Sequence, residues 1–398
     1  MSFILLCILV YPTAPFLYDL TKSAAFQILI FLIIIIKYAC NYKKKIVLNN
    51  FPYLMTLVVL LLNLLFFKEN IFNIREILFI LFISTFQFIN KELEYNLIIK
   101  DVFMILFAFL FSAFLFLVIY YYLGLINYND FAVNKLNLEK SNPILSRQEG
   151  GDFDYFLINK ILVIPYTTDK FEIFGFKYLR QSFIFLEPFF LNNILVPFAL
   201  LFFYIKQSMK YIHYLLFILF VLIVGISIWT LISMFIVGTV IYLNNKFKFG
   251  KLFFLAVTFL LIYSFSFEFY SSIINYISPE KSLQLLKLSN KMSLDNITYF
   301  GSSFLDESTY ITYGASINIV RYGLVGIIFY FSIWAHLLNK FLSFSTRYYV
   351  VSFAGIISLL LSLKMPQFTL LITLFIYNYI LFLNKSKSDN KNVQFSFQ

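Results

Sequence analysis

Long apolar runs recur along the whole chain and constrain its fold more than any other feature. A helix needs about 20 mostly apolar residues to cross a bilayer, and the sequence contains about twelve such runs. Only 13% of the residues are charged, against about 25% in a soluble domain. We therefore expect an all-α polytopic membrane protein with about 12 transmembrane helices. The expected spans are 3–20, 24–40, 52–67, 74–89, 101–124, 189–206, 211–228, 229–245, 249–266, 316–338, 346–363 and 367–384.

Basic residues alternate between the connections of these spans. With the N-terminus inside, sixteen Lys and Arg fall in the inner loops and the tail, and four fall in the short outer loops. Short loops rich in Lys and Arg stay in the cytoplasm, so both termini are expected to be cytoplasmic. The first span lacks a basic leader and is expected to stay uncleaved. The net charge of +11 is explained by this loop pattern, so the lipid bilayer is an expected partner and nucleic acid is not.

Two polar segments are too long to be simple turns, and the orientation places both outside. They divide the chain into six parts: helices 1–5 in 1–124, a large outer loop in 125–188, helices 6–9 in 189–266, a second outer loop in 267–315, helices 10–12 in 316–384 and a cytoplasmic tail in 385–398. Long loops are typically functional or disordered. These two are rich in Tyr, Phe and Ile and are expected to fold against the membrane, whereas the polar tail is expected to be disordered.

Signatures of metal or cofactor sites are missing from the sequence. Cys7 and Cys40 have no metal-binding spacing, and no glycine-rich phosphate loop is present. His213 and His336 fall near the inner ends of spans, where interfacial side chains are more common than ligands. We expect neither a metal nor a cofactor.

The run Arg180-Gln-Ser-Phe-Ile-Phe-Leu-Glu187-Pro188 closes the large outer loop. Arginine presents a planar, permanently charged fork that suits phosphate. Glu187 follows seven residues later, so the two side chains share a face if the run is helical. Pro188 suits the first turn of the next span. A plain Arg–Glu anchor at the membrane surface is the alternative interpretation.

A second cluster surrounds the start of the span at 316–338. Arg321 lies more than one turn inside it, where a charged side chain is expected to face the bundle interior or a water-filled cavity. Snorkelling toward the headgroups is the alternative. Asn318 can share its face, and Asp306 and Glu307 lie just upstream. Arg147, in an acidic glycine-containing part of the large loop, is a further candidate for substrate binding.

The Arg180–Pro188 run resembles the Arg-x-x-Gly-x-Phe-x-Glu-Pro run of O-antigen polymerases, the Wzy-type members of the O-antigen ligase and polymerase superfamily. Phe183 stands where the family has glycine. Ser227-Ile-Trp-Thr230-Leu-Ile-Ser233 occupies the place of the family's Ser-Arg pair and has no arginine. Asn318-Ile-Val-Arg321-Tyr-Gly-Leu-Val-Gly326 looks like the family's run into a Gly-Leu-x-Gly span.

The resemblance implies a metal-independent membrane glycosyltransferase of the bacterial inner membrane. Its substrates would be polyprenyl-pyrophosphate-linked oligosaccharide repeat units, polymerised at the outer face into O-antigen or capsular polysaccharide, with a chain-length regulator as a possible partner. Arg180 and Arg321 would stabilise the pyrophosphate leaving group, and Glu187 would accept the acceptor's proton. Asp306, Glu307, Asn318 and Arg147 would bind substrate.

Three alternatives remain open. An O-antigen ligase has the same architecture but typically carries a histidine in the large outer loop, and neither outer loop here contains one. A polysaccharide flippase or other transporter would more often show internal repeats. A structural membrane subunit gives no role to an arginine inside a span.

Overall fold

The computed structural model describes residues 1–10, 20–21, 23–41, 51–66, 71–117, 153–158, 162–173, 176–181, 188–206, 228–247, 314–344, 348–362 and 370–395. The helices are α1 (Ser2–Val10), α3 (Ala24–Cys40), α4 (Phe51–Phe66), α5 (Ile71–Ser84), the 3₁₀ helix η2 (Thr85–Phe88), α6 (Glu92–Leu117), α7 (Pro188–Lys206), α9 (Ile228–Phe247), α13 (Gly314–Phe344), α14 (Tyr349–Leu361) and α15 (Leu371–Phe395). The three strands are β1 (Phe153–Ile158), β2 (Leu162–Ile173) and β3 (Phe176–Gln181).

Helices occupy most of the ranges in which the sequence predicts spans. α3 begins at Ala24, where the Oγ of Ser23 accepts a hydrogen bond from the backbone N–H of Phe26, as an N-cap does. α7 begins at Pro188, at the position expected for a first-turn proline. The ranges 11–19 and 249–266, and nearly all of 211–228, lie outside the described residues.

Several helices are longer than the apolar runs that predicted them, and α6 and α15 show why. α6 begins at Glu92, whose carboxylate and that of Glu94 lie in the first turn, where negative charge is favourable. α15 continues to Phe395, so most of the tail expected to be disordered is helical; its sequence contains no glycine or proline after residue 370. Within the described ranges, no helix is both long enough and apolar enough to cross a membrane.

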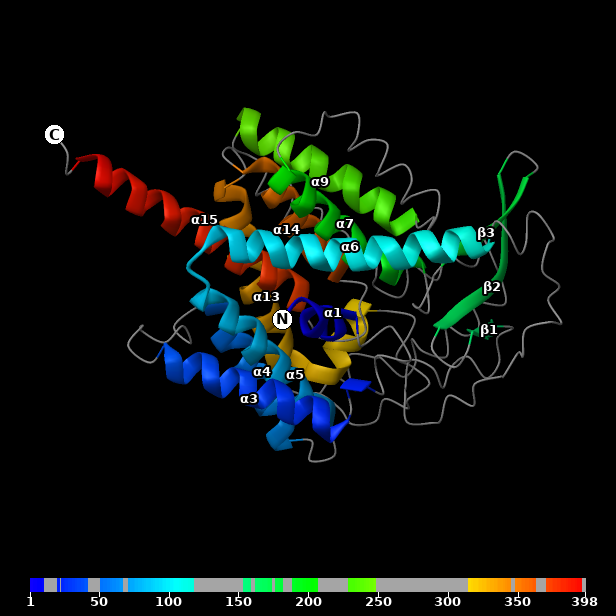
Figure 1. Ribbon diagram of the computed structural model, residues 1–398, viewed down its shortest axis with the longest axis horizontal. Coiled ribbons are helices and arrows are strands. Elements are labelled where there is room, and N and C mark those ends of the chain that lie inside the picture. Colours follow the sequence, from blue (N-terminus) through cyan, green and yellow to red (C-terminus); the bar gives the residue numbers. More distant parts are fainter. Residues whose placement is uncertain are drawn as a thin grey trace.

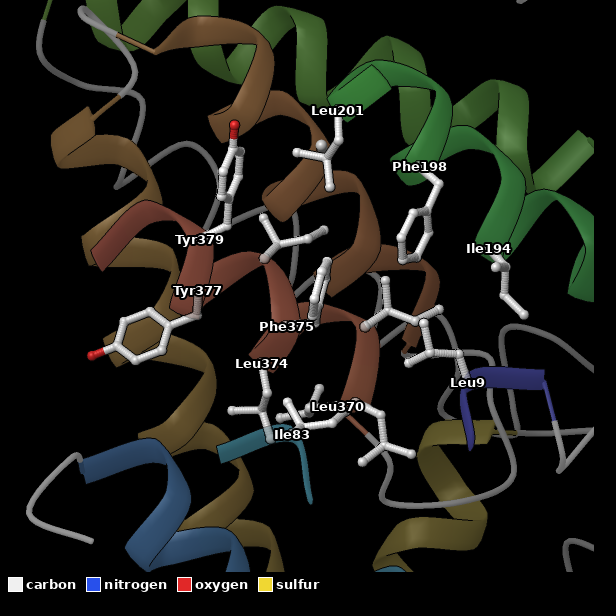
Figure 2. Packing of buried hydrophobic residues seen from close by; sticks show 14 of the residues in the cluster. Leu9, Ile83, Ile194, Phe198, Leu201, Leu370, Leu374, Phe375, Tyr377 and Tyr379 are labelled. Atoms are coloured by element: carbon white, nitrogen blue, oxygen red, sulfur yellow. The ribbon is translucent and has the colours of Figure 1, made fainter. Parts of the chain in front are cut away.

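The helices pack together in one bundle (Figure 1), and a buried apolar core joins them. α14 lies at its centre and contacts α7, α9, α13 and α15. Figure 2 shows Phe198 of α7 facing Phe375 of α15, and their rings stack with centroids 5.6 Å apart. Every described residue of α15 from Leu371 to Ile380 is buried, so the first half of this helix is enclosed on all sides.

Tyrosines gather at the opposite end of the core from the strands. The Tyr95 hydroxyl donates to the carbonyl of Phe86 at 2.8 Å, and the Tyr379 hydroxyl donates to Oδ1 of Asn96 at 3.1 Å. Burial, with smaller contributions from Tyr53 and Tyr379, raises the pKa of Tyr95 well above its usual range. The Tyr95 hydroxyl therefore remains a neutral donor at physiological pH.

The large predicted outer loop contains a small antiparallel sheet with the strand order β1-β2-β3. Phe153 pairs with Thr167 at one end of the β1–β2 ladder, and Tyr166 pairs with Gln181 across β2 and β3. In Figure 1 the strands lie at the right, near the C-terminal end of α6. The helices fit the expected all-α class, and the sheet is an element that the sequence analysis did not predict.

Candidate functional site

The residues predicted to act on substrate divide into two groups. Arg180 lies on β3, and Asn318 and Arg321 lie on α13; the structure places their backbones and does not define their side chains. Arg147, Glu187, Asp306 and Glu307 lie outside the described residues.

Of the run from Arg180 to Pro188, the structure describes the two ends. The two side chains would share a face if the run were helical, but Arg180 belongs to a strand that ends at Gln181, and the next described element is α7. The pairing of Tyr166 with Gln181 holds the end of this strand in the sheet. A side-chain period of two therefore governs Arg180 in place of the helical period of 3.6.

The sequence analysis did not predict a set of buried polar side chains near the predicted outer ends of five helices. All are at most 5% exposed. We call this set the outer polar layer. Its members are Arg75 and Glu76 of α5, Asn192 and Asn193 of α7, Thr230 and Ser233 of α9, Ser358 and Ser362 at the end of α14, and Thr373 of α15.

Contacts between helices show that the members on α7 and α14 lie at one depth. At the opposite end, the rings of Tyr204 and Tyr348 approach to 6.2 Å. Asn193 lies eleven residues before Tyr204, and Leu359 lies eleven residues after Tyr348. Because α-helices rise about 1.5 Å per residue and the two helices run antiparallel, Asn193 is level with Leu359 and thus with its neighbour Ser358.

α9 meets α14 in the same way. A side-chain atom of Phe353 lies 4.0 Å from the position that a Cβ on Gly238 would take. Ser233 lies five residues before Gly238, and Ser358 lies five residues after Phe353. The two serines are therefore level with each other, and Thr230 is one turn further out.

α5 completes the layer from the other side of α15. The Asn378 side chain donates from Nδ2 to the carbonyl of Ile83 at 2.9 Å. Glu76 lies seven residues before Ile83, and Leu371 lies seven residues before Asn378. Since α5 and α15 run in the same direction, Glu76 is level with the first turn of α15, within a turn of Thr373.

Contacts of Ser358 and Ser362 link the outer end of α14 to its neighbours. The hydroxyls of Ser358 and Thr373 lie 2.9 Å apart in a buried hydrogen bond. Ser362 interacts with the hydroxyl of Tyr330 on α13. The layer thus ties α14 to α15 on one side and to α13 on the other.

A proline adds a backbone acceptor to the layer. Pro197 lies inside α7 and has no N–H to donate to the carbonyl of Asn193, four residues earlier. In an apolar surrounding, such a carbonyl is satisfied by nearby polar side chains or by water. The position of Pro197 therefore adds to the polar character of the layer beside Asn193.

α7, which follows the Arg180 run in the sequence, and α13, which carries Arg321, extend beyond the layer on the same side. Pro188, where the Arg180 run ends, lies about 6 Å along α7 from Asn192. Arg321 lies nine residues, or about 14 Å, along α13 from Tyr330. On both helices this direction leads away from the tyrosine-rich end, toward the side on which α7 begins.

The outer polar layer has one cation and one anion together with amides and hydroxyls. Arg75 and Glu76 are 3% and 0% exposed, and both have interaction partners, as buried charges require. The signal in the sequence was Arg-Glu and Asn-Asn, each at the start of an apolar run. Charged and amide side chains are common at helix ends, so nothing in the sequence indicated that these four are buried. Their burial became visible only once the helices were placed.

Comparisons with known proteins identify no relative: no family model, no curated protein and no solved structure matches this chain. The resemblance to O-antigen polymerases therefore depends on the motifs of the sequence alone.

Proposed function

We propose that this protein polymerises lipid-linked oligosaccharide repeat units at the outer face of the bacterial inner membrane. The observation that carries the proposal is the outer polar layer. This buried set of polar groups lies near Pro188, where the Arg180 run ends, and on the same side of the bundle as the start of α13, which carries Arg321. Polar and charged groups inside an apolar bundle are costly to bury, and they are retained most readily where a site needs them.

Membrane insertion is part of the proposal, and the surface of α3 supports it. Six large apolar side chains of this helix are between 46% and 59% exposed: Ile28, Leu29, Phe31, Leu32, Ile35 and Ile36. Contiguous exposed apolar surface marks contact with a membrane or a partner.

In the proposed reaction, an acceptor hydroxyl attacks the anomeric carbon of the donor glycan. The bond from that carbon to the pyrophosphate oxygen breaks, a glycosidic bond forms, and the lipid pyrophosphate leaves. Arg180 and Arg321 stabilise the charge that develops on the leaving group. A carboxylate takes the proton of the hydroxyl, with Glu187 as the first candidate and Asp306 or Glu307 as the next.

Single substitutions test this assignment in a strain that lacks the chain. Arg180→Ala and Arg321→Ala should each abolish polymer and leave glycans with a single repeat unit. Arg347→Ala is the control, because Arg347 is predicted in an inner loop away from the site and this variant should polymerise normally. Wild-type polymer length in both Arg180→Ala and Arg321→Ala, with normal protein levels, contradicts the assignment.

The ligase is the strongest alternative, and the same strain distinguishes it. Loss of a polymerase leaves single repeats attached to the surface, whereas loss of a ligase leaves full-length polymer that is not attached. The absence of histidine from 125–188 and 267–315 favours the polymerase, since ligases typically carry a histidine in the large outer loop.

A further inference from the structure

We infer that the outer polar layer is a positioning layer for the proposed polymerase site: the hydrogen bond between Ser358 and Thr373 fixes the outer end of α14, and α14, which packs against α7 and α13, holds both helices at the depth and rotation that the reaction needs. This inference depends on the proposed function and assigns roles to residues that lie in neither outer loop. None of these side chains needs to touch substrate.

Burial decides between binding and positioning. Glu76, Asn192 and Thr230 are 0% exposed and Asn193 is 1% exposed, so these side chains are enclosed by protein. Enclosed groups act on a substrate only through the elements that they hold. The layer also contains one cation and one anion among its nine residues, a balance that does not suit a pyrophosphate, which arginine-rich sites bind.

The layer connects to both helices that it would have to position, α7 and α13. α14 is its centre, because its Ser358 bonds to Thr373 of α15 and its Ser362 interacts with Tyr330 of α13. α14 also contacts α7 and α9 directly. A change at the end of α14 is therefore transmitted to both helices that lead to Arg180 and Arg321.

An apolar core alone would fix these helices less well. Between apolar surfaces in a membrane the hydrophobic effect gives no preferred register, and hydrogen bonds between helices supply part of it. Hydrogen bonds are directional, so they define rotation and depth. In a group-transfer site, a misplacement of about 1 Å can cost about 10²-fold in rate.

The test uses the buried hydroxyl pair. Thr373→Val removes the hydroxyl and keeps the shape, Thr373→Ser restores a hydroxyl, and Ser358→Ala removes the partner. Ser352→Ala is the matched control: Ser352 lies on the same helix, is equally buried, and its Oγ has no hydrogen-bond partner among the residues that the structure describes. The purified full-length proteins are assayed with lipid-linked repeat units extracted from the deletion strain, and kcat and KM are measured separately.

We expect Thr373→Val and Ser358→Ala to lower kcat at least tenfold with little change in KM, and the double variant to be no worse than either single one. Thr373→Ser should recover most of the rate, and Ser352→Ala should match the wild type. If Thr373→Val does not fold, Ser358→Ala carries the same comparison.

Other outcomes overturn the inference in distinguishable ways. Wild-type kcat in both variants shows that the layer does not position the site while the protein remains a polymerase. A raised KM with unchanged kcat shows that the layer contributes to binding and not to positioning. A wild-type protein that does not extend the repeat units removes the proposed function and this inference together.

Discussion

At the scale of single residues, a glycine of α14 packs tightly against an aromatic ring of α13. A Cβ at Gly355 of α14 would lie 2.9 Å from three atoms of the Phe341 ring, and Phe341 is fully buried. The ring belongs to α13, so the glycine sets how near the two helices approach. Small residues at helix interfaces allow this close approach.

We expect Gly355→Ala to lower the free energy of unfolding by about 1–3 kcal/mol, the usual cost of overpacking. Gly238→Ala is the matched control, because the nearest side-chain atom is at 4.0 Å there; alanine is favoured over glycine in a helix by up to about 1 kcal/mol. Thermal unfolding of the two purified variants gives the comparison. Equal melting temperatures would contradict the packing described at Gly355.

The Tyr95 hydroxyl supports the turn between α5 and α6. Tyr95→Phe should cost about 1 kcal/mol, because it removes the bond to the carbonyl of Phe86 in η2 and leaves the ring packing intact. Tyr349→Phe, at an exposed tyrosine, should stay within about 0.5 kcal/mol of the wild type. Denaturant unfolding curves measure both, and an unchanged midpoint for Tyr95→Phe would count against the hydrogen bond.

At the scale of elements, the sequence predicted helices well and strands poorly. The run 24–40 became α3 with the same bounds, because a long apolar run with a Ser cap and a basic last turn defines a helix locally. The strands depend on partners such as Tyr166 and Gln181, fifteen residues apart, and no local pattern in 125–188 fixed that register. The start of α6 and the end of α15 were also misplaced, because hydropathy detects the apolar part of a helix and not its polar turns.

The sequence pointed to some residues of the candidate site and not to others, for a related reason. Arg180 and Arg321 were noticed because each is a charge at an unusual place in a motif. Asn193 and Thr373 are ordinary residues whose burial depends on α14, a helix distant from Asn193 in the sequence. Their shared depth follows from helix packing, which a reading of periodicity cannot supply.

The proline of α7 gives a test at this scale. Pro197→Ala restores a donor for the carbonyl of Asn193, and removing a proline from a helix interior relieves a cost of about 3 kcal/mol where the backbone can adjust. We expect an unchanged or higher melting temperature together with a severalfold lower rate of polymerisation. A variant with wild-type stability and a wild-type rate of polymerisation would show that the carbonyl of Asn193 has no part in the layer.

At the scale of the whole molecule, the two cysteines report orientation. Cys40 is exposed at the end of α3 that is predicted to face the cytoplasm, and Cys7 is buried. A membrane-impermeant maleimide should therefore leave intact cells unlabelled and modify Cys40 after permeabilisation. Ser141→Cys, in the predicted large outer loop, is the positive control and should react in intact cells. Labelling of Cys40 from outside would invert the orientation and the site with it.

The enclosure of Glu76 has a consequence for how the protein is made. α15, which helps to cover α5, begins nearly three hundred residues after Glu76. At about 5–20 residues per second, a nascent chain carries Arg75 and Glu76 for about 15–60 s before the last helix emerges from the ribosome. During that interval these two charges depend on water, lipid headgroups or a membrane chaperone, and a chain truncated before α15 presents them to cellular quality control as unfinished.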